Sequence, residues 1–113
     1  MVTIFDNFSN AEKRSVSSLA NMGAKIIEGD ITKLEDITNV TNDHYIVVHL
    51  AAKISVEESI KSPSETFHIN VDWTRNVLIA CEKNHIKKLV VASSAAVYGE
   101  GMPGLKLTEE SKM

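Results

Sequence analysis

The sequence is poor in the features that would tie it to a membrane or to an oxidising compartment. It has a single cysteine, Cys81, which cannot form an internal disulfide and fits a reducing cytoplasm. Its longest apolar run, residues 45–52, is far shorter than the ~20 residues that a helix needs to cross a bilayer. The N-terminus lacks the basic region and apolar segment of a secretion signal. We therefore expect a cytoplasmic protein with no membrane partner.

Charge and histidine content exclude two further classes of function. The formal net charge is −3 and the 12 lysines and arginines are scattered, so we expect no nucleic-acid partner. The four histidines show no metal-ligand spacing and no second cysteine stands near Cys81, so we expect no metal site. The 43% hydrophobic and 24% charged content is that of a globular chain, and residues 1–113 are predicted to form one unit.

What the sequence does contain is an alternation of short apolar runs with helical patterns. Strands are predicted at residues 2–5, 25–28, 45–50 and 88–92, and helices at residues 11–22, 33–40 and from 62 to about 84. Gly23 suits the left-handed stop of the first helix. This alternation is typical of βαβ units, so the predicted fold class is α/β with a parallel sheet and flanking helices.

The third helix has the clearest local signals. Ser62 can cap it, Pro63 suits its first turn and Glu65 completes a capping box. Apolar or small side chains then recur at helical spacing, which predicts one face that packs on the sheet: Phe67, Val71, Thr74, Leu78 and Cys81. On that face Cys81 is expected to be a small core residue rather than a nucleophile.

The segment at residues 89–99, LVVASSAAVYG, is the most informative one. An apolar run without alternation predicts a strand buried on both faces, as in a parallel sheet. Ligands of open parallel sheets bind beyond the carboxyl ends of the strands, and Ser93 and Ser94 follow there. A pair of serines that merely ends a strand fits the spacing equally well.

Four short segments follow one another in an informative order, and Asn70-Val71 is a fifth, weaker one. They are FDNFSN at residues 5–10, EGDI at 28–31, HLAA at 49–52 and SSAAVYG at 93–99. Together they resemble the extended short-chain dehydrogenase/reductases, specifically the NAD-dependent epimerase/dehydratase family that includes UDP-glucose 4-epimerases. The resemblance spans nearly the whole chain and implies a partial Rossmann-type fold, NAD as the cofactor and a nucleotide sugar as the substrate.

The resemblance assigns cofactor contacts residue by residue. Asp6 falls where the family's acidic residue accepts hydrogen bonds from the adenosine ribose, and its carboxylate would repel a 2′-phosphate, which favours NAD over NADP. Asn7 and Asn10 fall on the adenosine side, and Asp30 and Ile31 fall where the adenine is held. Taken alone, Asp6 reads as a turn residue and Asp30 as a helix cap, so both alternatives stay open.

The third strand and the long helix supply the other expected contacts. Leu50, Ala51 and Ala52 lie where the family's backbone approaches the cofactor, although small residues also pack closely at a strand end. Asn70 would lie near the nicotinamide half, although an asparagine within a helix is commonly bonded locally. Lys53 is offset by one position from a lysine of some epimerases, so we assign it no catalytic role.

Ser94 aligns with the family's catalytic serine, whose hydroxyl bonds the substrate oxygen being oxidised, while Ser93 is expected to support the turn. Two family elements are absent from the sequence. One is the glycine-rich turn after a first strand, which holds the pyrophosphate. The other is the Tyr-x-x-x-Lys pair, whose tyrosine is the general base; Tyr98 belongs to the strand-end motif and is not that base. Without the pair, Ser94 can orient a substrate but cannot deprotonate it.

The missing first strand has a structural consequence. In the strand order 3-2-1-4-5-6 of this fold it lies between the strands at residues 2–5 and 45–50, so its absence leaves a gap of about 10 Å, two strand spacings. Both neighbours would expose unpaired backbone and apolar faces. We expect the isolated chain to be poorly stable or to fill the gap by self-association.

The chain is therefore interpreted as an internal piece of a longer NAD-dependent nucleotide-sugar epimerase/dehydratase, with UDP-sugar 4-epimerisation as the favoured reaction. The parent would transfer a hydride between NAD and a sugar ring carbon. The fragment alone is expected to be inactive, and the resemblance admits a homodimer. The main alternative is a non-catalytic NAD(P)-binding regulatory or structural protein of the same fold. A flavodoxin-like module is the second, but it leaves the ordered motifs unexplained.

Overall fold

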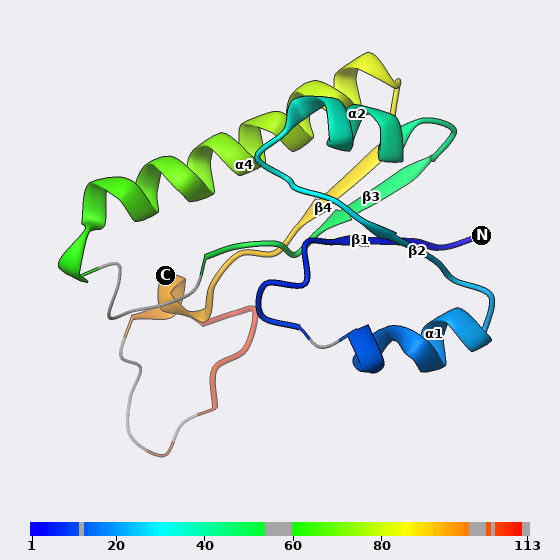
Figure 1. Ribbon diagram of the computed structural model, residues 1–113. Coiled ribbons are helices and arrows are strands. Elements are labelled where there is room, and N and C mark those ends of the chain that lie inside the picture. Colours follow the sequence, from blue (N-terminus) through cyan, green and yellow to red (C-terminus); the bar gives the residue numbers. More distant parts are fainter. Residues whose placement is uncertain (12, 54–59, 100–103, 105, 112–113) are drawn as a thin grey trace.

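In the described part of the chain, four short strands lie between the helices (Figure 1). The computed structural model describes residues 1–11, 13–53, 60–99, 104 and 106–111. Its strands are β1 (Thr3–Asp6), β2 (Lys25–Glu28), β3 (Ile46–His49) and β4 (Lys88–Val91). The predicted strands are confirmed, each to within one residue at either end.

The strands pair in parallel, as predicted, but in two separate sheets. β1 pairs with β2, so that Asp6 lies opposite Glu28, and β3 pairs with β4, so that His49 lies opposite Val91. Among the described residues no strand joins β1 to β3. The interruption lies where the sequence lacks a first strand, which confirms a partial Rossmann-type sheet.

The helices lie on both sides of the strands (Figure 1): α2 (Leu34–Thr41) and α4 (Pro63–Lys83) pack together on one side, and α1 (Ser17–Asn21) lies on the other.

The helix predicted at residues 11–22 is shorter than expected, since α1 has only five residues. It is preceded by a 3-10 turn, η1 (Lys13–Val16), in which the Ser17 hydroxyl donates to the carbonyl of Arg14. A serine that bonds its own backbone competes with regular helix at this position. The helix ends before Gly23, whose φ of +92° is the predicted left-handed stop.

The long helix begins and ends where the sequence indicates, but its predicted cap is not formed. α4 starts at Pro63, with Ser62 at the cap position, and ends at Lys83, before Asn84. The Ser62 side chain makes no capping hydrogen bond; instead its carbonyl accepts from Thr66 N at 3.1 Å. Its ψ of 66° departs from the extended backbone usual at an N-cap. The Glu65 side chain lies outside the described part of the chain.

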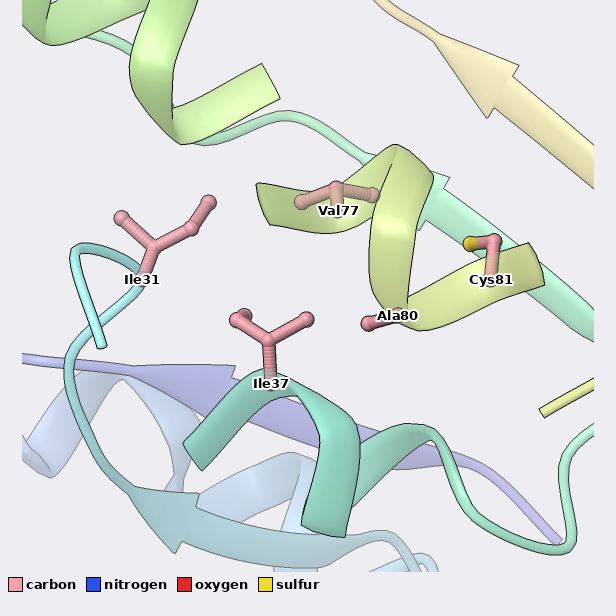
Figure 2. Packing of buried hydrophobic residues seen from close by; sticks show 5 residues of the cluster. All are labelled: Ile31, Ile37, Val77, Ala80 and Cys81. Atoms are coloured by element: carbon pink, nitrogen blue, oxygen red, sulfur yellow. The ribbon is translucent and has the colours of Figure 1, made fainter. Parts of the chain in front are cut away.

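The hydrophobic core lies between α4, α2 and the turn after β2. Figure 2 shows its five buried members, Ile31, Ile37, Val77, Ala80 and Cys81. The predicted core position of Cys81 is confirmed, and burial raises the pKa of its thiol. The prediction that the rest of this face is buried is largely wrong, because α4 packs Val77 and Ala80 against α2 instead. The exposed fractions of Phe67, Val71 and Leu78 are 65%, 46% and 52%.

Much apolar surface stays open. The chain exposes 9002 Å², whereas a folded monomer of this mass exposes about 6,100 Å². Its radius of gyration is 16.4 Å, against about 13 Å for a compact domain of this length. Ile46, Val48 and Leu50 are among the large side chains that are more than half exposed. In the part of the chain that the structure describes, no helix is long and apolar enough to cross a membrane.

Candidate functional site

The parallel pairing brings most of the predicted site residues to one edge. Asp6 is the last residue of β1, Asp30 follows β2, Ala51 follows β3 and Ser94 follows β4. Since β1 runs parallel to β2 and β3 to β4, each pair ends at the same edge of its sheet. This is the edge at which open α/β sheets bind ligands.

The turn after β1 is built from its own asparagine and aspartate side chains. Asp6 Oδ1 accepts from the N–H of Phe8 at 2.7 Å, and Asn7 Oδ1 accepts from the N–H of Ser9 at 3.0 Å. Phe8 adopts a φ of +53° between these two bonds. The turn reading of Asp6 is therefore correct, and it orients the carboxylate beyond the strand end. Among the described contacts, Asp6 uses only its Oδ1 atom. The turn is therefore compatible with the contact to a cofactor ribose that the resemblance implies for this carboxylate. Asn10 lies exposed just beyond.

A close approach between β1 and the turn after β2 was not predicted. The ring of Phe5 lies against Gly29 so tightly that a Cβ atom on Gly29 would stand 2.3 Å from Phe5 Cε2. The Gly29 N–H also donates to the carbonyl of Asp6 at 3.1 Å. Gly29 stands in the EGDI segment, and a glycine directly after a strand is the signal that could have revealed the contact.

Asp30 organises the turn that leads to α2. Its Oδ1 accepts from the N–H of Thr32 at 2.9 Å, and its own N–H donates to Asp36 Oδ2 at 3.1 Å. The bond from the Thr32 backbone holds the pKa of Asp30 below its usual value. Ile31 buries its side chain in the core, while Asn76 of α4 donates to the carbonyls of Ile31 and Thr32 at 3.1 and 3.0 Å. Only the backbone of Ile31 can therefore face a ligand.

The loop after β3 is held by α4. The Asn70 amide bonds the Lys53 backbone twice: Oδ1 accepts from its N–H at 2.8 Å, and Nδ2 donates to its carbonyl at 3.1 Å. The Asn70 side chain is therefore neither solvated nor bonded within its own helix, because both of its partners lie 17 positions away in the loop after β3. Leu50, Ala51 and Ala52 lie exposed between β3 and this anchor, so their backbone is open to a ligand.

A second link joins β3 to α4 one turn further along the helix. His49 is buried, and its Nε2 lies 3.2 Å from Thr74 Oγ1. Since the Thr74 hydroxyl donates to the carbonyl of Asn70 at 2.9 Å, it is the acceptor of an Nε2–H from His49. Burial lowers the pKa of His49, in keeping with a neutral ring. Sequence reasoning missed this pair, because the two residues lie in different elements.

The segment after β4 forms the short 3-10 turn η2 (Ala95–Tyr98), capped by a serine. Ser94 Oγ accepts from the N–H of Ala96 at 3.1 Å, which leaves the hydroxyl proton for an acceptor on a ligand. Ser94 is exposed. Ser94 has an extended backbone, and its side chain caps the turn, whereas a role of Ser93 in supporting the turn stays a prediction.

The chemistry of this edge is that of a polar binding surface. It presents the carboxylates of Asp6 and Asp30, the amide groups of Asn7 and Asn10 and the hydroxyl of Ser94. In the part of the chain that is described, no three His, Cys, Asp or Glu side chains gather as a metal site would require. A ribose with vicinal hydroxyls fits an acceptor such as Asp6.

Comparison with known proteins decides the family. The sequence profile of the NAD-dependent epimerase/dehydratase family matches residues 1–113. The chain belongs to this family. The predicted resemblance and its NAD dependence are thereby confirmed at the level of the family.

Relatives and solved structures in this family agree. The chain is 35% identical over 104 residues to a UDP-glucose 4-epimerase of Klebsiella pneumoniae, covering 88% of this chain and 75% of the relative. It is 36% identical over 99 residues to one of Corynebacterium glutamicum, covering 88% and 29%. It is also similar to the structure of UDP-glucose 4-epimerase from Bifidobacterium longum in complex with NAD+ and UDP, with a TM-score of 0.81 and 29% identity over 98% of this chain and 34% of that one. The chain thus spans about a third of the Corynebacterium relative and of this structure.

Proposed function

We propose that the edge formed by the carboxyl ends of the strands binds the adenosine half of NAD in an enzyme that acts on nucleotide sugars. The observation that carries the proposal is the placement of Asp6. Its carboxylate ends β1 and is held there through Oδ1 by the Phe8 N–H, in a chain of an NAD-dependent family. A carboxylate at the end of this strand is suited to the ribose hydroxyls of NAD and opposes the 2′-phosphate of NADP.

The neighbouring residues receive the roles that their geometry permits. Asn7 and Asn10 would contact the adenosine, and the turn at Asp30 and Ile31 would hold the adenine, Ile31 through its backbone alone. Leu50, Ala51 and Ala52 would let the backbone approach the cofactor. Asn70 would act on the nicotinamide side by holding the Lys53 backbone rather than through direct contact, since both ends of its amide are already engaged.

The reaction proposed for the whole enzyme is UDP-sugar 4-epimerisation, supported by the similarity to the UDP-glucose 4-epimerases of Klebsiella and Corynebacterium. Bound NAD supplies a hydride acceptor for a sugar ring carbon. The Ser94 hydroxyl would donate a hydrogen bond to the substrate oxygen and so orient the sugar. A serine hydroxyl cannot itself remove a proton without an adjacent base, so we propose that this chain alone is inactive. The open apolar stripe of Phe67, Val71 and Leu78 on α4 is compatible with a homodimer.

Asp6→Asn tests the proposal directly. The amide oxygen of asparagine can still accept from the Phe8 N–H, so the turn is kept while the charge is lost. We expect calorimetric titration of the native chain to show a preference for NAD over NADP, and Asp6→Asn to reduce that preference about tenfold, equivalent to about 1.4 kcal/mol. Asp43→Asn, at an exposed turn with a φ of +61° that asparagine tolerates, is the matched control. Equal binding of NAD and NADP by the native chain would overturn the proposal.

A further inference from the structure

The turn between β2 and α2 uses most of its own N–H groups within the chain. The Lys33 N–H donates to the carbonyl of Asp30 at 3.0 Å, which closes a β-turn over residues 30–33. The Asp30 N–H donates to Asp36 Oδ2 at 3.1 Å, and the Thr32 N–H donates to Asp30 Oδ1 at 2.9 Å. Three of the four N–H groups of this turn are therefore engaged by the turn and by α2.

Asn76 of α4 takes the two carbonyls in the middle of the turn. Its Nδ2 group, which has two hydrogens, donates to the carbonyl of Ile31 at 3.1 Å and to that of Thr32 at 3.0 Å. These bonds span 45 and 44 positions, so a distant helix fixes both peptide groups. The Ile31 side chain lies in the same core cluster as Val77 of α4 (Figure 2). The turn is thus held against α4 by apolar and by polar contacts.

The N–H of Ile31 is the main-chain group that this arrangement leaves over. Among the hydrogen bonds of the described residues, none uses it. Because the carbonyl of Ile31 is taken by Asn76, the main chain of Ile31 can offer a ligand a donor and no acceptor. The turn lies at the surface, since Asp30 is half-buried and Thr32 is exposed.

We propose that Asn76 is a positioning residue that sets the base specificity at the adenosine end of the cofactor site. By occupying both carbonyls it makes the turn a donor, and a donor selects a base whose ring nitrogen is an acceptor. The N1 atom of adenine is such an acceptor, whereas N1 of hypoxanthine carries a hydrogen. Asn76 acts through the turn and is not itself a ligand of the base. The inference rests on the proposed function, which places the adenine at this turn.

Loss of the Asn76 amide should therefore change selectivity as well as affinity. The two carbonyls that it frees could accept a hydrogen bond from hypoxanthine, while adenine would lose a donor that is held in place. A residue that only stabilises the fold behaves differently, because partial unfolding lowers the binding of both bases by the same factor.

Titration of the native chain with adenosine monophosphate (AMP) and inosine monophosphate (IMP), followed through the amide NMR signal of Ile31, tests the proposal. The two nucleotides share the ribose and the phosphate, so only the base differs. We expect the Kd of the native chain for AMP to be about tenfold lower than for IMP, because IMP leaves the donor unpaired. In Asn76→Ala we expect the Kd for AMP to rise about tenfold and the preference over IMP to disappear.

Asn84 provides a matched control at the other end of α2. Its Nδ2 also donates twice, to the carbonyl of Thr38 at 2.7 Å and to Thr41 Oγ1 at 2.8 Å, and both asparagines are half-buried. Asn84→Ala should lower stability to a similar degree and keep the preference for AMP. Asn76→Leu resembles asparagine in shape, favours helix more strongly and carries no donor. It replaces Asn76→Ala if that variant does not fold, with the same expected loss of preference.

The possible failures point to different parts of the account. An unchanged preference for AMP in the folded Asn76 variant would contradict the positioning role, and so would an equal loss of preference in Asn84→Ala. Equal binding of AMP and IMP by the native chain would also refute this inference, while a preference for NAD over NADP would leave the proposed function standing. If the native chain bound neither nucleotide, the proposed function would fail and this inference with it.

Discussion

The side-chain amide of Asn70 holds the backbone of Lys53 at both its N–H and its carbonyl, at 2.8 and 3.1 Å. One residue of α4 thereby fixes the path of the chain after β3, where Ala51 and Ala52 lie at the proposed cofactor edge. A side-chain amide carries a donor and an acceptor in one plane, so it can serve a peptide N–H and a carbonyl at the same time.

Loss of this clamp should destabilise the chain. Asn70→Ala removes two half-buried hydrogen bonds worth about 1 kcal/mol each, so we expect the free energy of unfolding in urea to fall by about 2 kcal/mol. Asn39→Ala, at an exposed position on α2, is the control and should change it little. Faster exchange of the Lys53 amide in Asn70→Ala would locate the effect. Equal stability of the two variants would show that the clamp contributes nothing.

Gly29 should tolerate no side chain while Phe5 is present. A Cβ atom at this position would lie 2.3 Å from the Phe5 ring, so Gly29→Ala forces the ring or the turn after β2 to shift. Overpacking of this kind costs about 1–3 kcal/mol, measurable by thermal or urea unfolding. In a double-mutant cycle Phe5→Leu should relieve most of the cost, because it removes the ring atoms that clash. Additive effects of the two substitutions would contradict the contact.

Stability should fall as the solution becomes mildly acidic. Burial lowers the pKa of His49 from 6.5, so the unfolded chain binds a proton at higher pH than the folded chain does. The stabilising contribution of the neutral ring is full above pH 6.5 and is lost as the pH falls toward the folded pKa. His49→Gln should flatten this part of a plot of unfolding free energy against pH, whereas His85→Asn, at an exposed turn, should not. If the unfolding free energy of the native chain does not change with pH below 6.5, this role of His49 is disproved.

At lower pH, the protonation of Asp30 should cause a second loss of stability. Hydrogen bonds from Thr32 lower its pKa below 3.8, so its contribution is present above that pH and is lost as the pH falls through the folded value. Asp30→Asn should reduce the slope of the unfolding free energy in this lower window and leave the His49 window intact. An unchanged slope below pH 3.8 in Asp30→Asn would contradict the role of the carboxylate.

Local patterns were sufficient to predict the strands and the ends of the long helix. The segment KIIE at residues 25–28 lies between Gly23 and Gly29, and it forms β2 with the predicted limits. Pro63 and Asn84 mark the ends of α4 for equally local reasons, a fixed φ and a poor helix former.

Long-range packing accounts for what the sequence did not predict. Helical spacing groups Phe67, Val71 and Leu78 into a stripe, but contact with α2 decides which side of α4 is buried, and it selects Val77 and Ala80. The pairs Asn70–Lys53 and His49–Thr74 join residues 17 and 25 positions apart, beyond the reach of any periodic pattern. The site residues could be proposed only through the resemblance, since each turn aspartate also fits an ordinary local role.

The most direct test of the account is saturation-transfer NMR of NAD with this chain. Binding of the adenosine half at the strand ends predicts that saturation reaches the adenine and adenosine ribose protons more strongly than the nicotinamide protons. ADP-ribose should compete the signal away, and Asp6→Asn should weaken it. Saturation confined to the nicotinamide protons, or no transfer at millimolar NAD from a folded sample, would contradict the claim that this edge of the sheet holds adenosine.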